Sequence, residues 1–213
     1  VTSSNPTAGG ATVGTGLSPG VIGDGDVVGI VKAYLTRVGS GPLPTELAGV
    51  EGDTPGYDGD AGDEEEALAT AIREAGDEYG TVTGRPRRVG WLDLPMLRHS
   101  TRASGFTGLA INHVDTLAIL DELEVATAYE LDGERIETMP ATTEQWADCD
   151  PVYRTFDGWD DQDWAAVAAE GYEALPENAR TYLEYISDEL DVPIYAIGIG
   201  PGREETIVLE TPY

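Results

Sequence analysis

The sequence predicts an α/β fold in which helices flank a mixed β-sheet. Short apolar runs alternate along the 213 residues with amphipathic helical patterns, and clusters of glycine and proline separate these segments. No internal repeat and no long linker divides the chain. We therefore expect residues 1–213 to belong to a single domain with a substantial buried core.

The first half is expected to contain two helices among irregular segments. Residues 1–20, rich in Gly, Ser and Thr, are either a ligand-binding loop or a solvated terminus. Residues 27–37 mix strand and helix patterns and are assigned here to a helix, whereas glycines and prolines forbid regular structure in residues 38–47. Residues 48–65 predict an exposed acidic loop rather than a metal site, because no histidine accompanies their carboxylates. Residues 66–79 carry apolar side chains at helical spacing and predict an amphipathic helix.

The middle of the chain combines a helix, a buried strand and a hairpin. Residues 92–102 predict a helix that Gly105 ends, and the apolar residues 107–112 predict a buried strand. An Asp-Gly pair between residues 123–131 and 134–139 is a strong signal for a type I′ hairpin.

The last part predicts a helix followed by two strands. A helix opens at Pro176, and the two strands at residues 192–199 and 206–210 are joined by a glycine-rich loop. One face of that helix is apolar and consists of Ala179, Tyr182, Leu183, Ile186 and Leu190. The aromatic residues just before it are expected to pack in the core; they are Trp146, Tyr153, Phe156, Trp159 and Trp164.

Charge and cysteine content exclude several classes of protein. Forty acidic residues face twelve basic ones, of which only Lys32 is a lysine, and the net charge is −28. This balance argues against nucleic acid as a partner and favours adaptation to high salt, in which stability rises as cations screen self-repulsion. The single Cys149 excludes an intrachain disulfide and a thiolate metal cluster and is expected to be a buried, inert thiol.

Targeting features are also few. No apolar run is long enough to span a bilayer, so we expect a soluble, cytoplasmic protein without a membrane partner. Because the chain begins at Val1 rather than Met, we expect a processed product or a fragment.

An island of positive charge lies within this acidic chain. Between Gly80 and Gly105, five arginines stand against one aspartate, a local sum of +4. Three of them, Arg85, Arg87 and Arg88, fall within four residues and suit a carboxylate or phosphate. The alternative is that these arginines pair with neighbouring carboxylates. Clustering favours an anion site, because dispersed arginines would neutralise the surface more efficiently.

A polar turn follows the strand predicted at residues 107–112. The carboxylate of Asp115 could accept from the N1–H and 2-amino groups of guanine, a donor pair that adenine lacks. A helix cap or a surface aspartate is the alternative. The two histidines, His99 and His113, offer no set of partners for a metal or a catalytic triad.

Long strings of the sequence resemble the C-terminal half of adenylosuccinate synthetase. They include VTSSNPTAGG, KAYLTRVGSGPLPTEL, TGRPRRVGWLD, TGLAINHVDTL, PENARTYLEYI and VPIYAIGIGPGREETIVL. The chain is identified as an acidic, halophile-like member of that family. The resemblance implies the C-terminal portion of the family's P-loop-like fold and, by the family's habit, a homodimer.

The family is a GTP-dependent carbon–nitrogen ligase of purine (AMP) biosynthesis. It joins IMP to L-aspartate with GTP and Mg²⁺: it phosphorylates the purine 6-oxygen, and the aspartate amine then displaces that phosphate. A noncatalytic acidic module that binds a nucleotide or a dicarboxylate is the competing hypothesis.

The resemblance also assigns roles by position. Thr2 matches the contact to the IMP phosphate, Val38 touches the IMP ribose through its backbone, and Arg87 reaches both the GTP phosphate and the substrate. The aspartate-binding loop, in which Thr83 and Arg85 hold the carboxylate and Arg85 also lies near IMP, consists of Thr81, Val82, Thr83, Gly84, Arg85 and Arg87. The guanine is held by His113, Val114 and Asp115 and by the loop of Gly198, Ile199, Gly200 and Pro201.

Some family features differ or are absent. Val82, His113 and Gly198 replace a threonine, a lysine and a serine that are usual in the family. The phosphate-cradling loop, the catalytic aspartate and histidine and the Mg²⁺ ligands belong to the N-terminal half. We therefore expect no catalytic residue and no metal ligand in this chain, and no activity from it alone.

Overall fold

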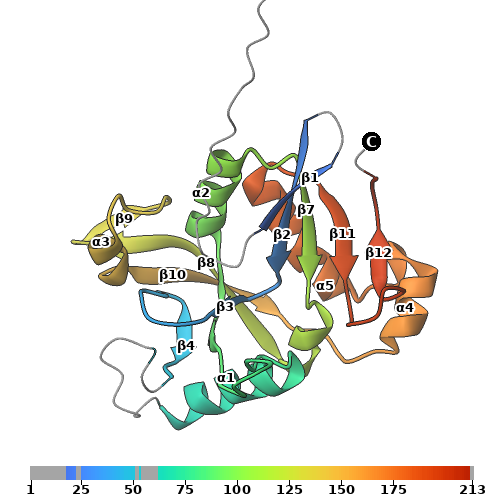
Figure 1. Cartoon of the computed structure of the whole chain (residues 1–213), viewed down its shortest axis with the longest axis horizontal. Helices are drawn as coiled ribbons and strands as arrows, with labels where there is room; N and C mark the ends of the chain where they lie inside the picture. Colours follow the sequence, from blue (N-terminus) through green and yellow to red (C-terminus); the bar gives the residue numbers. More distant parts are fainter. Residues whose placement is uncertain (1–17, 23–24, 51–52, 54–61, 212–213) are drawn as a thin grey trace, which may run out of the picture.

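Five strands form the central sheet of the computed structural model, which describes residues 18–22, 25–50, 53 and 62–211. Their order is β1 (Ser18–Ile22), β2 (Asp26–Lys32), β7 (Gly108–Asn112), β11 (Ile194–Gly198) and β12 (Thr206–Val208). The three inner strands are parallel, and the two edge strands run antiparallel to their neighbours (Figure 1). The α/β class with a mixed sheet is confirmed.

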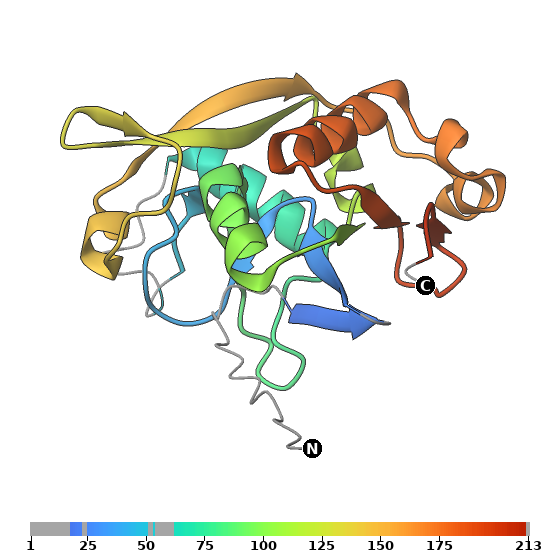
Figure 2. The same cartoon turned by 90° about the horizontal axis from the view of Figure 1, so that it is seen from above.

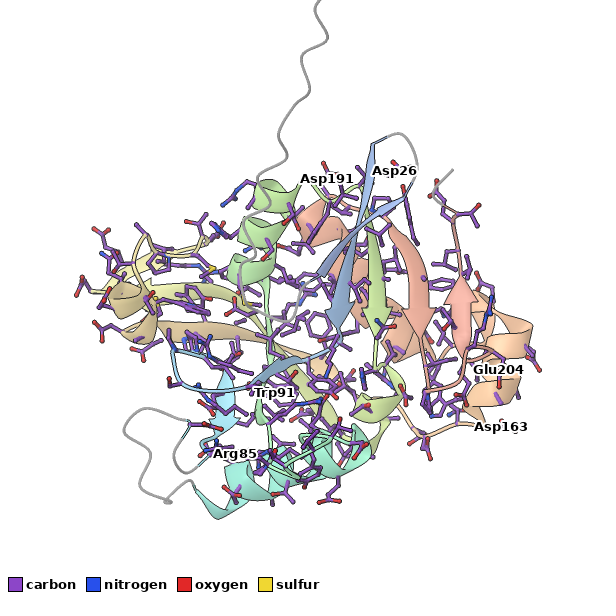
Figure 3. The ribbon with its side chains drawn as sticks, viewed as in Figure 1. Asp26, Arg85, Trp91, Asp163, Asp191 and Glu204 are labelled. Carbon is purple, nitrogen blue, oxygen red and sulfur yellow. The ribbon has the colours of Figure 1, made fainter. Side chains whose placement is uncertain are left out.

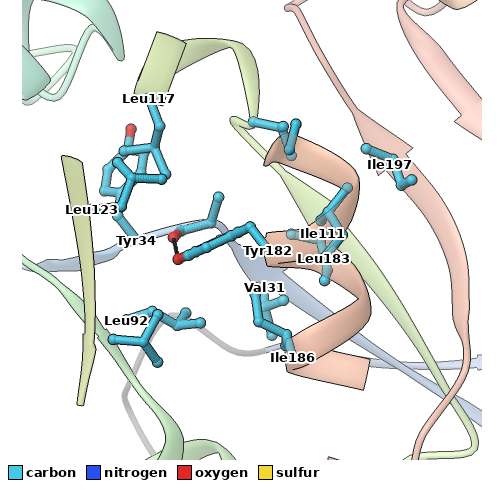
Figure 4. Close-up of a cluster of buried hydrophobic side chains, with 14 of the residues drawn as sticks. Val31, Tyr34, Leu92, Ile111, Leu117, Leu123, Tyr182, Leu183, Ile186 and Ile197 are labelled. Carbon is cyan, nitrogen blue, oxygen red and sulfur yellow. Dashed lines mark hydrogen bonds between the residues drawn. The ribbon is translucent and has the colours of Figure 1, made fainter. Parts of the chain in front are cut away.

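The main core lies between this sheet and the helix α5 (Glu177–Leu190). All five residues of the predicted apolar face are buried, and Figure 2 shows α5 along one side of the sheet. The hydroxyl of Tyr182 reaches across and donates to the carbonyl of Ala33 at 2.6 Å (Figure 4). Because Leu109 and Ile111 of β7 are fully buried, the expected buried strand is also confirmed.

A second sheet extends the molecule on one side. Its strands are β6 (Leu92–Asp93), β8 (Glu122–Leu131), β9 (Glu134–Ile136) and β10 (Asp150–Asp157). The φ angles of Asp132 and Gly133 are both positive, at 53° and 79°, which confirms the hairpin between β8 and β9.

The remaining elements are short or helical. A third sheet consists of β3 (Leu35–Arg37), β5 (Arg88–Gly90) and β4 (Glu46–Ala48). The other helices are α1 (Asp63–Ala75), α2 (Leu94–Ser104), η1 (Asp115–Ile119), α3 (Thr143–Ala147), α4 (Trp164–Glu170) and η2 (Tyr172–Ala174). The helix α2 ends where Gly105 adopts a φ of 66°, as expected. The predicted aromatic packing is confirmed, and Cys149 is buried.

The helix expected at residues 27–37 is wrong, because that segment forms β2 and β3. Its β-branched run Val27, Val28, Ile30 and Val31 suits a strand, and β2 pairs with β7 over five residues. A side chain at Gly29 would lie 2.6 Å from the ring of Phe106, so the strand also needs glycine there. Tertiary pairing has therefore overridden a helical pattern.

Other boundaries also differ from expectation. The helix expected at residues 92–102 begins only at Leu94, because Leu92 and Asp93 form β6, and residues 46 and 47, expected to be irregular, belong to β4. The helix expected at residues 66–79 begins at Asp63 and ends at Ala75, because Gly76 is its C-cap. The acidic loop expected at residues 48–65 lies largely outside the described residues, but Asp53 within it is buried rather than exposed. Among the helices of the described part, none is long and apolar enough to cross a membrane.

Candidate functional site

A cavity of about 450 Å³ lies where β2 and β7 end. The carboxyl ends of parallel strands meet at one edge of a sheet, and ligands of open α/β sheets bind there. The walls come from the two strand ends, the turn after α1, the start of η1 and the loop after β11. Four predicted guanine contacts line it, namely His113, Asp115, Gly200 and Pro201.

The carboxylate of Asp115 is the unusual group in this cavity. Its Oδ1 is buried and has no hydrogen-bond partner among the described residues. Burial raises the pKa of Asp115, although backbone N–H groups favour its charged form. A buried acceptor without a partner costs free energy, so this oxygen is suited to a donor from a ligand.

His113 occupies the turn between β7 and η1 with a φ of 63°, a conformation that few non-glycine residues adopt. Its Nδ1 lies 3.3 Å from Thr116 Oγ1, and its ring meets the edge of Tyr34 with centroids 5.8 Å apart. Burial, followed by the charge of Lys32, lowers the pKa of His113. The imidazole at the cavity wall is therefore neutral near pH 7 and offers no fixed charge.

A hydrogen bond joins the two predicted guanine-binding segments. The N–H of Val114 donates to the carbonyl of Gly198 at 3.3 Å, and Val114 and Ile199 are both fully buried. These two residues therefore support the cavity from the core rather than line it. A side chain at Gly198 would approach Asn112 Oδ1 to 2.3 Å, so the serine usual in the family would displace Asn112 here.

Beside the cavity, the fully buried Glu78 accepts hydrogen bonds from three side chains. Its Oε1 accepts from Lys32 Nζ at 2.5 Å and from the hydroxyl of Tyr34 at 2.6 Å, and its Oε2 accepts from Arg87 Nη1 at 2.6 Å. Burial alone would raise the pKa of Glu78, but these donors hold it below its usual value. Lys32 lines the cavity, so Glu78 connects the cavity to the arginine segment.

The predicted aspartate-binding loop is an exposed hairpin tip at residues 80–85. Gly80 donates to Arg85 O at 2.8 Å, Gly84 donates to Gly80 O at 2.7 Å, and Gly84 has a φ of 63°. The side chains of Thr81, Val82, Thr83 and Arg85 are exposed, with Val82 at 97%. Arg85 lies on the side of the molecule where β2 ends, opposite Asp26 at its start (Figure 3).

Each arginine of the cluster pairs with a carboxylate in this structure. Arg85 Nη2 lies 3.1 Å from Asp53, and Arg87 pairs with Glu78. Arg88 is 1% exposed and contacts both oxygens of Glu46, at 2.8 and 2.6 Å. The expectation that all three arginines serve one anion site is therefore wrong for Arg88, which instead holds β5 to β4 and to the carbonyls of residues 39 and 41.

The other predicted contacts are not gathered at the cavity. Val38 follows β3 and is 77% exposed, and Thr2 lies outside the described residues. Sequence reasoning missed Tyr34 and Glu78 as parts of the site. Lys32 carried one signal, since it is the only lysine of the chain.

The chain is similar to known proteins of one family. The family model described as adenylosuccinate synthetase matches residues 1–207. Proteins named adenylosuccinate synthetase from Haloarcula marismortui and Natronomonas pharaonis are 73% and 71% identical over the whole chain, and one from Halobacterium salinarum is 61% identical. The chain spans 46%, 46% and 44% of these curated relatives.

A solved structure is also similar. It is the fully ligated adenylosuccinate synthetase from Plasmodium falciparum, which is 35% identical with a TM-score of 0.72. The match covers 86% of this chain and 39% of that one. The acidic, halophile-like character expected from the sequence agrees with the haloarchaeal relatives.

Proposed function

We propose that this chain, which belongs to the adenylosuccinate synthetase family, supplies the guanine-binding and aspartate-binding parts of an enzyme that joins IMP to L-aspartate with GTP. The observation that carries the proposal is the unpartnered buried oxygen of Asp115 in a cavity at the ends of parallel strands. Guanine offers two adjacent donors to such a carboxylate, and adenine does not. The carboxylate would therefore select GTP over ATP.

The rest of the cavity supports a planar base. His113 presents a neutral ring, and Gly200 and Pro201 offer backbone and a small apolar surface in the same cavity. The segment of Gly198 to Pro201 would close over the base. The departures at His113 and Gly198 change the contacts to GTP but leave the carboxylate in place.

The hairpin tip would bind the amino acid substrate. Arg85 already holds a carboxylate, that of Asp53, while its side chain is 54% exposed. The carboxylate of L-aspartate would take the place of Asp53, and Thr83 would add a hydroxyl. Val82 offers no hydroxyl at this tip, so the loop binds the substrate through fewer polar groups than usual in the family.

In this proposal the chain binds and orients substrates, and the remainder of the protein performs the chemistry. GTP phosphorylates the 6-oxygen of IMP, and the aspartate amine then displaces that phosphate to form the new carbon–nitrogen bond. Thr2 and the backbone of Val38 would contact IMP. Residues 1–213 would form the C-terminal part of one domain in a homodimer of purine biosynthesis.

Mg²⁺ would be held by residues outside this chain. Within the described residues, no group of three or more His, Cys, Asp or Glu side chains could hold a metal ion. When bound in the family's enzymes, Mg²⁺ neutralises phosphate charge during phosphoryl transfer. No residue of this chain is assigned to it.

A titration tests the guanine assignment. The whole chain is titrated with GTP, ATP, IMP and L-aspartate in concentrated KCl, before and after Asp115→Asn. We expect selective GTP binding that weakens about 100-fold in the variant, because the asparagine replaces one of the two acceptor oxygens by a donor that faces a donor of guanine. Asp121→Asn is the matched control, since Asp121 is exposed and lies outside this cavity. Equal binding of all four compounds would contradict the proposal.

A turnover assay tests the division of labour. We expect no adenylosuccinate from the chain alone. Activity should appear when the part of the Haloarcula marismortui protein that this chain does not match is added or fused. Turnover by the chain alone would refute the assignment of catalysis to other residues. Failure of the fused protein to turn over would favour a noncatalytic binding module.

A further inference from the structure

Two cations share one buried carboxylate at the edge of the cavity. Lys32 Nζ and Arg87 Nη1 lie on opposite oxygens of Glu78, which is itself fully buried. The side chains of Lys32 and Arg87 remain 27% and 31% exposed. Both cations can therefore contact a ligand on their exposed side while they stay hydrogen-bonded to the buried Glu78.

We propose that Lys32 and Arg87 together bind the phosphates of a purine nucleotide, and that Glu78 is the positioning residue that holds the two cations in place. The inference rests on the proposed function and adds Lys32 and Glu78 to it. Lys32 already lines the cavity that would receive the base.

The balance of charge supports an anion site here. Lys32 and Arg87 share the single carboxylate of Glu78, which can neutralise only one of them, whereas Arg88 and Glu46 nearby neutralise each other. The carboxylates of Asp77 and Asp115 also line the cavity, but neither is paired with Lys32 or Arg87. Phosphates bind lysine and arginine through charge-assisted hydrogen bonds.

Close packing explains why Glu78 can position its partners. A side chain at Gly76 would lie 2.2 Å from the Tyr34 hydroxyl and 3.2 Å from Glu78 Cγ. The hydroxyl of Tyr34, the third donor, and the side chain of Glu78 therefore pack closely against Gly76, without room for a further atom. The carboxylate is held in one orientation, and its two cations are held with it.

Two roles of Glu78, balancing charge and positioning the two cations, predict opposite changes in phosphate affinity when Glu78 is replaced. If Glu78 only balanced charge, its replacement by glutamine would strengthen phosphate binding, because a negative charge is removed. If it positions the cations, binding weakens, because a glutamine side chain cannot accept from donors at both of its ends. Glu78→Asp keeps the charge but shortens the reach, so only the positioning role predicts a loss there.

Calorimetric titrations of the whole chain with GTP, guanosine and tripolyphosphate test the inference. We expect Glu78→Gln, Glu78→Asp and Lys32→Met each to weaken GTP and tripolyphosphate about tenfold, the loss of one charged hydrogen bond. Guanosine affinity should stay unchanged, since it lacks phosphate. Arg135→Gln is the matched control, because Arg135 lies on the exposed hairpin strand β9.

The titrations distinguish a failure of phosphate binding by Lys32 and Arg87 from a failure of guanine binding. Unchanged or tighter tripolyphosphate binding in the Glu78 variants, or none in the parent chain, would overturn the inference. Equal weakening of GTP and guanosine would also overturn it, because it indicates a collapsed cavity. If Glu78→Gln does not fold, Lys32→Met and Glu78→Asp decide the question. A parent chain that binds tripolyphosphate but neither guanosine nor GTP over ATP contradicts only the proposed function.

Discussion

Two fully buried carboxylates, Glu78 and Asp93, have opposite chemistry in this molecule. Glu78 accepts from two cations and a phenol, and its pKa lies below the usual value. Asp93 accepts from Met96 N and from the hydroxyl of Tyr129, and burial raises its pKa to about 6. Cations therefore favour the charged form of Glu78, whereas Asp93, which lies deeper in the protein and accepts only from neutral donors, titrates near pH 6.

The difference also separates the proposed binding site from a structural cap. Asp93 begins α2 and orders a helix, whereas Glu78 pairs with Lys32, which lines the cavity, and with Arg87, which follows the hairpin tip. The charged carboxylate lies where the proposed ligand carries charge.

The largest effect is expected from Glu78→Leu. The variant leaves Lys32, Arg87 and the Tyr34 hydroxyl without their shared acceptor, so the free energy of unfolding should fall by about 4 kcal/mol. Urea unfolding in concentrated KCl measures this loss. Glu64→Leu is the control, because Glu64 is exposed in α1 and should change stability by about 0.5 kcal/mol or less. Similar losses in both variants would contradict the assigned role.

The second largest effect is expected from Asp93→Asn, which should change how the free energy of unfolding depends on pH. The folded-state pKa of Asp93, about 6, lies above its ordinary 3.8, so its contribution to stability is full below about pH 4 and is lost as the pH rises through 6. The loss amounts to about 3 kcal/mol. The asparagine can still cap α2 but does not titrate.

The comparison is therefore made between pH 4 and pH 7. The stability of the variant relative to the parent chain should rise over that interval in thermal or urea unfolding. Glu78 has the opposite sign, since its contribution is present above its ordinary pKa and lost as the pH falls. A constant difference between variant and parent would show that Asp93 stays charged throughout.

Removing one phenol from each carboxylate is expected to have a smaller effect. Tyr129→Phe takes a donor from Asp93 and an acceptor from Trp146 Nε1, and we expect a loss of about 2 kcal/mol. Tyr34→Phe should cost about 1 kcal/mol, because Glu78 keeps both cations. Urea unfolding compares the two, and Tyr129→Phe should also move the pH transition of Asp93 upward. Equal losses of stability in the two variants, with no shift in the pH transition of Asp93, would contradict the difference between Glu78 and Asp93.

The sequence predicted the local parts of the site but not Glu78. The strand at residues 107–112 and the turn with His113 and Asp115 depend on neighbouring residues, so a local pattern was enough to predict them. Glu78 instead depends on Lys32 and Tyr34, which are 46 and 44 residues away. In the sequence it looked like the end of a helix, and no local pattern indicates which side chains will reach it.

The two wrong predictions, the helix at residues 27–37 and the anion-binding role of Arg88, also depend on contacts between residues far apart in the sequence. The segment 27–37 contains both periodicities, and only its pairing with β7 decides between them. The role of Arg88 depends on Glu46, 42 residues away, and on a burial that charge clustering does not indicate. Local patterns predicted the polar and charged residues of the candidate site, whereas pairing across the fold decided that Arg88 is structural.

The smallest effect on stability is expected from Arg85→Ala. Its pair with Asp53 is more than half exposed at the arginine, and such pairs contribute about 0 to 1 kcal/mol. Urea unfolding should therefore change little, whereas calorimetric binding of L-aspartate should weaken about tenfold or more because its carboxylate loses a guanidinium partner. Arg102→Ala is the control, since Arg102 is exposed in the last turn of α2. If Arg85→Ala lowered stability as much as Glu78→Leu, the exposed Arg85 would have a structural role. The contrast between the buried charge of Glu78, which stabilises the fold, and the exposed charge of Arg85, which is available to a ligand, would then be wrong.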